Sequence, residues 1–276
     1  MSTVDLSGNT VKLWKSEVVE GLELKRAFLK NFTFSRHMDD RYVICLVQRG
    51  VELFRCGGIS YAATPGDIIL YHPEDVHDGG SIDQKPWAYR CFYVTEAQVR
   101  STSAGDSELG PLPFFPEKVI RDPSLAGRLS ALHRLMETHE DTLPVQTAFV
   151  ELFSRLVSCH SRQAGSGKIH RRFHARASLL RSRDFLEGHF AESTALGRLA
   201  ALAGLSPFHF LREFKRYFGM PPHEYQKQLR VRRAKDLLAQ GLPPADVAAE
   251  AGFSDQSHLS RVFRGFTGIT PGRFRP

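Results

Sequence analysis

Hydrophobic and polar positions alternate in short runs through roughly the first 120 residues, a pattern that predicts β-strands. Apolar residues dominate Tyr42–Val47, Ile68–Tyr71 and Trp87–Val94, and between the first two Val51, Leu53 and Arg55 alternate with Glu52, Phe54 and Cys56. Gly57-Gly58 and Pro65-Gly66-Asp67 interrupt the runs where hairpins would turn. Strands of this length and spacing are typical of an antiparallel sandwich or barrel.

Beyond residue 120 the period changes from two to between three and four, which predicts amphipathic helices. Two helices are expected within residues 121–163, with broad apolar stripes. The stripe positions are Leu125, Leu129, Leu132, Leu135 and Met136 in the first, and Val145, Ala148, Phe149, Leu152, Phe153, Leu156 and Val157 in the second. The stripes could pack on the barrel or form a dimer interface, and periodicity alone leaves both open.

The last 80 residues contain an internal repeat. Ala203-Gly-Leu-Ser206 recurs as Ala251-Gly-Phe-Ser254 at a shift of 48, and the residues that follow recur at a shift of 49. One residue is therefore inserted between the second serine and its helix. The later pairs are Phe210 with Leu259, Arg212 with Arg261, Phe214 with Phe263, Tyr217 with Phe266, Gly219 with Gly268, Pro222 with Pro271 and Tyr225 with Phe274.

Each copy predicts a helix, a tight turn and a second helix. Gly204 and Gly252 end the first helices, and Ser206 and Ser254 are expected to be the N-caps of the second ones. This arrangement is the helix-turn-helix, whose second helix enters the DNA major groove. A longer helix over Pro222–Gln240 separates the copies and spans about 27 Å, near the 34 Å repeat of a DNA turn.

Charge supports a polyanion partner for the C-terminal part. Residues 166–276 hold 19 Lys and Arg against 9 Asp and Glu, a net charge of +10, while the rest of the chain is −3. No apolar run reaches membrane-spanning length, and no basic region followed by an apolar one marks a signal peptide. The four cysteines, far apart and without a C-x-x-C pair, are expected to be reduced thiols in a cytoplasmic protein.

Leu196–Phe274 resembles the DNA-binding domain of the AraC/XylS family of bacterial transcription regulators. The resemblance is carried by the repeated Ala-Gly-[Leu/Phe]-Ser turn, Arg232–Leu238, and Phe263–Pro271. It implies base contacts by Phe208, Arg212, Gln256, Ser257, Ser260 and Arg261. Leu211 stands at a position where the family contacts bases, but an apolar side chain makes no polar base contact. Arg212 or the second helix-turn-helix unit is therefore expected to contribute more of the sequence recognition. Lys215, Arg230, Arg233 and Arg264 are the expected phosphate contacts.

Gly66–Pro73 followed by His77 resembles the cupin-like effector domain of the same family. A small polar effector is expected in the barrel, with His37, Arg55, His77 and Tyr89 as its contacts. The alternative is a metal-dependent dioxygenase or metal sensor, because His37, Asp39 and His77 supply two imidazoles and a carboxylate. The preferred interpretation has no catalytic residue, no metal and no cofactor.

The expected fold is α+β, an antiparallel jelly-roll barrel with two following helices and then an all-α domain. The expected boundaries are 1–120 for the effector domain, 121–163 for a helical dimerisation segment, 164–175 for a linker and 176–276 for the double helix-turn-helix domain. The expected partners are a double-stranded operator, a small-molecule effector, RNA polymerase and a second copy of the chain, but no membrane. Whether the protein activates or represses is left open.

Overall fold

A computed structural model describes residues 3–4, 8–81, 85–101, 112–138, 142–162 and 177–274. The chain divides into two compact units, an N-terminal one that runs to Gly165 and a helical one from Ser166 to Arg275, and each is considered by itself. Strand β4 (Thr33–His37) is grouped with the sheet to which it is hydrogen-bonded. The expected linker, residues 164–175, lies outside the described residues.

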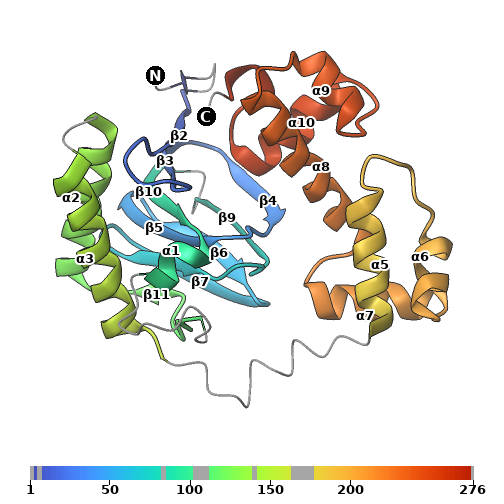
Figure 1. Ribbon diagram of the computed structural model, residues 1–276, viewed down its shortest axis with the longest axis horizontal. Coiled ribbons are helices and arrows are strands. Elements are labelled where there is room, and N and C mark those ends of the chain that lie inside the picture. Colours follow the sequence, from blue (N-terminus) through green and yellow to red (C-terminus); the bar gives the residue numbers. More distant parts are fainter. Residues whose placement is uncertain are drawn as a thin grey trace. The chain divides into compact units, whose positions relative to one another are not determined.

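The N-terminal unit contains two antiparallel sheets (Figure 1). The larger sheet has the order β1 (Thr3–Val4), β2 (Thr10–Lys15), β3 (Glu23–Leu29), β10 (Trp87–Val94), β5 (Tyr42–Arg49), β8 (Ile68–Tyr71) and β11 (Val119–Ile120). The smaller has the order β4, β9 (His77–Ser81), β6 (Glu52–Cys56) and β7 (Ile59–Ala63). The expected jelly roll is confirmed, as two sheets rather than a closed barrel.

The two faces of the larger sheet have different partners, because successive side chains of a strand point to opposite sides. Phe92 and Val94 of β10 belong to the hydrophobic core shared with the helices that follow the sheets. On the opposite face, Tyr71 of β8 stacks on His77 of β9, with ring centroids 3.7 Å apart, and meets Phe54 of β6 at 5.5 Å. That face therefore packs against the smaller sheet and forms the interior of the jelly roll.

Two helices, α2 (Pro123–Thr138) and α3 (Thr142–His160), cover the outer face of the larger sheet (Figure 1). Their stripes are buried in the same core as Ile44 and Leu70 of the sheet. The interpretation that the stripes pack on the barrel is therefore confirmed, and a dimer contact through these helices would have to use their opposite faces. A short helix, α1 (Glu96–Ser101), follows β10.

The helical unit contains the two predicted helix pairs and the helix between them. Its elements are α5 (Ala177–Gly188), α6 (Leu196–Ala203), α7 (Pro207–Phe218), α8 (Pro222–Ala239), α9 (Pro244–Glu250), α10 (Gln256–Thr267) and the 3-10 turn η2 (Pro271–Arg273). Phe210, Phe214, Leu259 and Phe263 of α7 and α10 are fully buried. Among the described residues, no helix is long and apolar enough to cross a membrane.

The expectation of four reduced thiols is wrong for two of them, because Cys45 and Cys91 form a disulfide. The two residues stand directly opposite each other on β5 and β10, with their Cα atoms 4.1 Å apart. A separation of 46 positions gives no sign of this pairing, which only the strand register creates. Cys56 is a free buried thiol and Cys159 a free exposed one.

Thiol counting checks this assignment. Protein purified without reductant should take up two alkyl groups when it is denatured, at Cys56 and Cys159, and four after reduction. In the folded protein only Cys159 should react rapidly, because Cys56 is buried. Mass spectrometry of the intact protein measures each number, and four labels without reductant would contradict the pairing.

Candidate nucleic-acid interface and ligand site

The first helix pair has the turn that its sequence predicts. Helix α6 ends at Gly204, whose φ of 65° lies in the left-handed region that glycine enters without steric cost. Ser206 then caps α7, because its hydroxyl accepts the backbone N–H of His209 at 3.4 Å. Both predictions for this copy are confirmed.

In the second copy the predicted cap is off by one residue. Asp255, not Ser254, is the N-cap of α10, and its carboxylate accepts the N–H of His258 at 2.7 Å. The residue inserted into this copy moves the helix start from the serine to the aspartate. Ser254 instead donates its hydroxyl to Asp255 Oδ2 at 2.9 Å, so it holds the cap in place.

The outer faces of α7 and α10 carry the residues expected to read bases. Phe208 is 78% exposed, which is unusual for a large apolar side chain and leaves its ring available to a thymine methyl group. The side chain of Arg212 is 65% exposed. Gln256, Ser257 and Arg261 are exposed and Ser260 is half-buried. All four lie in the first two turns of α10. Five of the six side chains are therefore exposed to solvent, and Ser260 is partly so.

A carboxylate that the sequence reasoning missed organises the arginines of α7. Glu213 accepts from Arg216 Nη2 at 2.6 Å, and Arg212 Nε lies 3.8 Å from the same carboxylate. The hydrogen bond from Arg216 lowers the pKa of Glu213. The i, i+3 spacing of Glu213 and Arg216 was the available sequence signal. The exposed Arg216 thereby joins Arg212 and Lys215 on the solvent side of the helix.

The four expected phosphate contacts differ in their surroundings. Lys215 is exposed, whereas Arg233 and Arg264 are half-buried. Arg230 is engaged inside the domain: its Nε donates to the carbonyl of Phe190 at 2.7 Å and its Nη2 to that of Glu192 at 3.0 Å. Burial lowers the pKa of Arg230. This guanidinium therefore holds the loop between α5 and α6 against α8.

The expected effector contacts occupy different faces of the N-terminal unit. Tyr89 and His77 are buried, and burial raises the pKa of the tyrosine and lowers that of the histidine. His77 donates from Nδ1 to the carbonyl of Asp75 at 2.9 Å. Half-buried His37 donates in the same way to Ser35. The side chain of Arg55 is 60% exposed and pairs with Asp78, so it lies away from the other three.

The structure brings together the three residues of the alternative metal site. One ligand atom each from His37, Asp39 and His77 lies within 4.8 Å of the others. Because both imidazoles donate from Nδ1 to backbone carbonyls, their Nε2 atoms are the ones that could face an ion. The arrangement could hold a divalent cation, but the relatives described below give no support for a dioxygenase.

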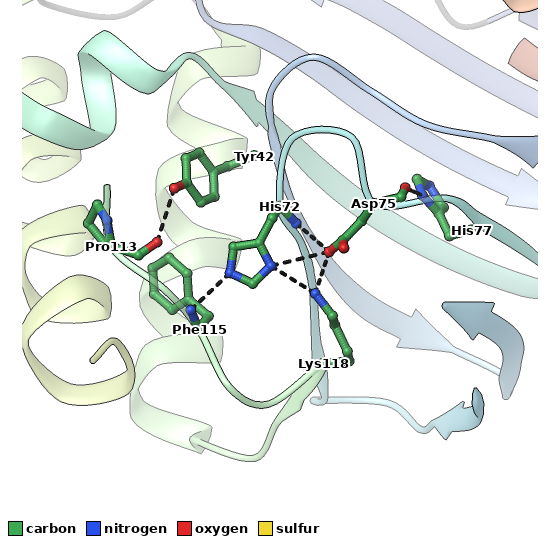
Figure 2. Close-up of polar contacts among 7 residues, drawn as sticks. All are labelled: Tyr42, His72, Asp75, His77, Pro113, Phe115 and Lys118. Carbon is green, nitrogen blue, oxygen red and sulfur yellow. Dashed lines mark hydrogen bonds and ion pairs between the residues drawn. The ribbon is translucent and has the colours of Figure 1, made fainter. Parts of the chain in front are cut away.

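A polar cluster beside His77 ties a neighbouring segment to the turn between β8 and β9 (Figure 2). His72 accepts the backbone N–H of Phe115 at Nε2, at 2.9 Å, and donates from Nδ1 to Asp75 at 3.2 Å. Lys118 forms an ion pair with the same carboxylate. Burial would raise the pKa of Asp75, but the hydrogen bonds from His72 and the charge of Lys118 lower it below its ordinary value. Because all three side chains are paired, the cluster is structural.

A second buried network joins β10 to α2 on the outer face. Arg90 donates to His133 Nδ1 at 2.8 Å and to Glu137 at 2.9 Å. His133 donates from Nε2 to the carbonyl of Lys25 at 3.2 Å, and burial lowers its pKa to about 3. The ring is therefore neutral and bridges a helix and a strand.

Comparison with known proteins matches both units. Residues 21–153 match the AraC-like ligand binding domain and residues 199–276 a helix-turn-helix domain. An uncharacterized HTH-type transcriptional regulator of Bacillus subtilis, YbfI, is 32% identical over 226 residues, which is 82% of this chain and 81% of that protein. The arabinose operon regulatory protein of Escherichia coli is 24% identical over 241 residues, covering 85% and 80%.

The fold has a parallel among solved structures. The crystal structure of ToxT from Vibrio cholerae matches with a TM-score of 0.57 and 12% sequence identity. The match covers 93% of this chain and 97% of that one. At this identity the likeness concerns the fold, which has the same two parts in the same order.

The cap assignment can be tested by paired substitutions. Asp255→Ala should lower the melting temperature of the helical unit, because the N–H of His258 loses its acceptor. Ser254→Ala is the matched control and should cost less, since the carboxylate still caps the helix. Scanning calorimetry of the full chain measures both, and an equal or larger loss in the serine variant would contradict the assignment.

Proposed function

The chain belongs to the AraC family of transcription regulators, with a ligand-binding domain ahead of a helix-turn-helix domain, and from this premise we propose how its residues divide the work. The helices α7 and α10 enter neighbouring major grooves of one operator. The single observation that carries this proposal is the pair of matched helices, each buried through Phe or Leu on one side and presenting an arginine on the other.

Sequence reading is assigned to Phe208, Arg212, Gln256, Ser257, Ser260 and Arg261. Arginine bonds guanine in two places and glutamine does the same with adenine, so α10 offers two selective contacts. Lys215, Arg233 and Arg264 neutralise phosphates, which positions the domain without reading sequence. Arg230 is given a different role, because its guanidinium already bonds the carbonyls of Phe190 and Glu192.

The interior of the jelly roll is the proposed effector site, with His77 and Tyr89 among its buried side chains. An effector changes transcription only if it binds two arrangements of the protein with different affinity. The Arg90–His133–Glu137 network supports such a coupling, because it joins the back of the strand that carries Tyr89 to helix α2. A small polar molecule suits an interior that mixes aromatic rings with ionisable groups.

The wider setting follows from this role. A DNA-bound regulator works where the chromosome is, so the protein is placed in the cytoplasm, without enzymatic activity of its own. We propose a homodimer that pairs through the outer faces of α2 and α3, and contact with RNA polymerase at the promoter. Sedimentation of the full chain tests the dimer, and transcription with purified polymerase tests the second contact.

The DNA-binding role is tested by selection from random duplexes. The full chain should enrich a bipartite site whose two halves lie one helical turn apart. Binding to the enriched site should persist with heparin as competitor, at a concentration that removes binding to scrambled duplexes. Failure to enrich any sequence, with protein whose helical content is intact, would overturn the proposal.

Base contacts and phosphate contacts are separated by two arginine variants. Arg261→Ala should weaken binding to the selected site by about 1–3 kcal/mol and relax the preference at one base pair. Arg233→Ala should weaken all sequences alike and reduce the salt dependence of binding. Fluorescence anisotropy at several salt concentrations measures both, and equal losses on every sequence would show that the two roles are wrongly divided.

A further inference from the structure

Glu52 is a buried carboxylate that neither the sequence reasoning nor the family assignment includes. It lies on β6, is only 8% exposed, and shares its face of the strand with buried Phe54 and Cys56. The polar groups that act on its carboxylate are the charge of Lys25 and the indole of Trp87. Burying a carboxylate in this way is costly unless a partner arrives.

A buried donor without a hydrogen-bond partner lies on the strand that faces it. Trp87 of β10 is fully buried, and its indole Nε1 has no hydrogen-bond partner in the described structure. The same indole lowers the pKa of Glu52, so donor and acceptor approach each other without completing a bond. A buried indole N–H without a hydrogen-bond partner, facing a buried carboxylate, indicates that a third molecule completes the interactions.

A glycine leaves the room that the carboxylate uses. Gly79 of β9 is paired with Phe54, and a Cβ atom at this position would lie 2.9 Å from Glu52 Oε1. Any side chain here would push the carboxylate aside. The absence of a side chain at residue 79 therefore helps to define the position of Glu52.

A buried lysine and an aromatic ring lie in the same interior as Glu52 and Trp87. Lys25 of β3 is 6% exposed, stands beside Cys91 in the register, and places Nζ 5.7 Å from the ring centre of Tyr89. Its charge reaches Glu52 and favours the ionised carboxylate. The interior thus presents one acidic and one basic group with aromatic rings around them, and a cation alone would be repelled by Lys25.

We propose that Glu52, Trp87 and Lys25 form the effector site, and that the effector is a small zwitterion of the α-amino acid class. Its ammonium group binds Glu52, and its carboxylate binds Lys25 and the indole N–H of Trp87. Such a ligand adds no net charge to the interior and gives the indole N–H of Trp87 a partner. The assignment rests on the proposed ligand-binding function of this domain.

Proton linkage gives the site a signature. Burial raises the pKa of Glu52 to about 7, with Lys25 and Trp87 opposing the rise. An ammonium group needs the ionised carboxylate, so affinity should fall by about tenfold from pH 8 to pH 6. The other groups coupled to Glu52 stay constant in this range, because Tyr71, Tyr89 and Tyr93 have pKa values raised well above 10 by burial. Burial also lowers the pKa of His77, which favours its neutral form.

The first experiment is a thermal-shift panel on the full chain without DNA. The probes are the twenty common amino acids, simple sugars, monocarboxylates and primary amines. We expect an amino acid to raise the melting temperature, and its decarboxylated and deaminated counterparts to have little effect. If only a sugar, a monocarboxylate or an amine binds, or if no probe binds, the assignment is overturned.

Titration calorimetry of the binding amino acid with variants is the second experiment. Glu52→Gln should weaken binding at least tenfold at pH 8 and abolish the pH dependence, whereas Glu20→Gln in the exposed turn between β2 and β3 should change neither. Gly79→Ala should also weaken binding, because it displaces the carboxylate. Unaltered affinity in Glu52→Gln, or tighter binding at pH 6 than at pH 8, would exclude this site.

A folding control accompanies the glutamate variant. A raised pKa means that the folded state holds a proton which the unfolded state releases. The contribution of Glu52 to the stability of the folded protein therefore falls as pH rises from about 4.5 to 7. Glu52→Gln should therefore melt at the same or a higher temperature than the natural protein at pH 8. Operator binding by the same variant in the absence of ligand should be unchanged. If the natural protein binds its operator but no amino acid, only the proposed effector site is wrong. If the natural protein does not bind any operator, the proposed regulator function is wrong.

Discussion

The alternation of side chains along one central strand is the constraint on which the N-terminal unit depends. Strand β10 has a neighbour on each edge, β3 and β5, while α2 and α3 cover one of its faces and the smaller sheet covers the other. One face carries Phe92 and Arg90 towards α2 and α3, and the other carries Trp87 and Tyr89 into the jelly roll. One strand therefore carries both side chains of the proposed effector site and side chains that anchor the helices.

Helix termini play the equivalent role in the second unit. Two short helices crossing at a tight turn need a residue with positive φ, followed by a side chain that satisfies the exposed N–H groups of the next helix. Both copies meet these needs, one with Ser206 and the other with Asp255. The inserted residue was absorbed because an aspartate followed the serine. Each recognition helix thus begins at a defined residue, which fixes the side chains that it presents.

Sequence patterns were sufficient for most of the fold because its elements have strong local signals. Strand alternation, helical stripes and the repeated turn predicted both units and their outer arginines. They failed where the answer depends on partners distant in sequence. Cys45 and Cys91 meet through strand register. Glu52 is buried while Leu53 is 41% exposed, the reverse of what residue type favours. The sequence predicts Arg230 as a surface cation, whereas the structure shows it bonded to backbone carbonyls of the α5–α6 loop.

The loop between α5 and α6 also limits how the two helix-turn-helix modules can move relative to each other. Arg230 and Gln226 of α8 bond its carbonyls, and Gly252 of the second copy lies so close that a Cβ atom there would be 2.4 Å from the carbonyl oxygen of Ala191. The segment that joins α5 to the first copy is thus wedged against the second. The two modules are held as one piece, with little freedom to swivel. One base pair added between the half-sites turns one of them by about 34° around the duplex axis, so we expect the protein to accept only a single spacer length.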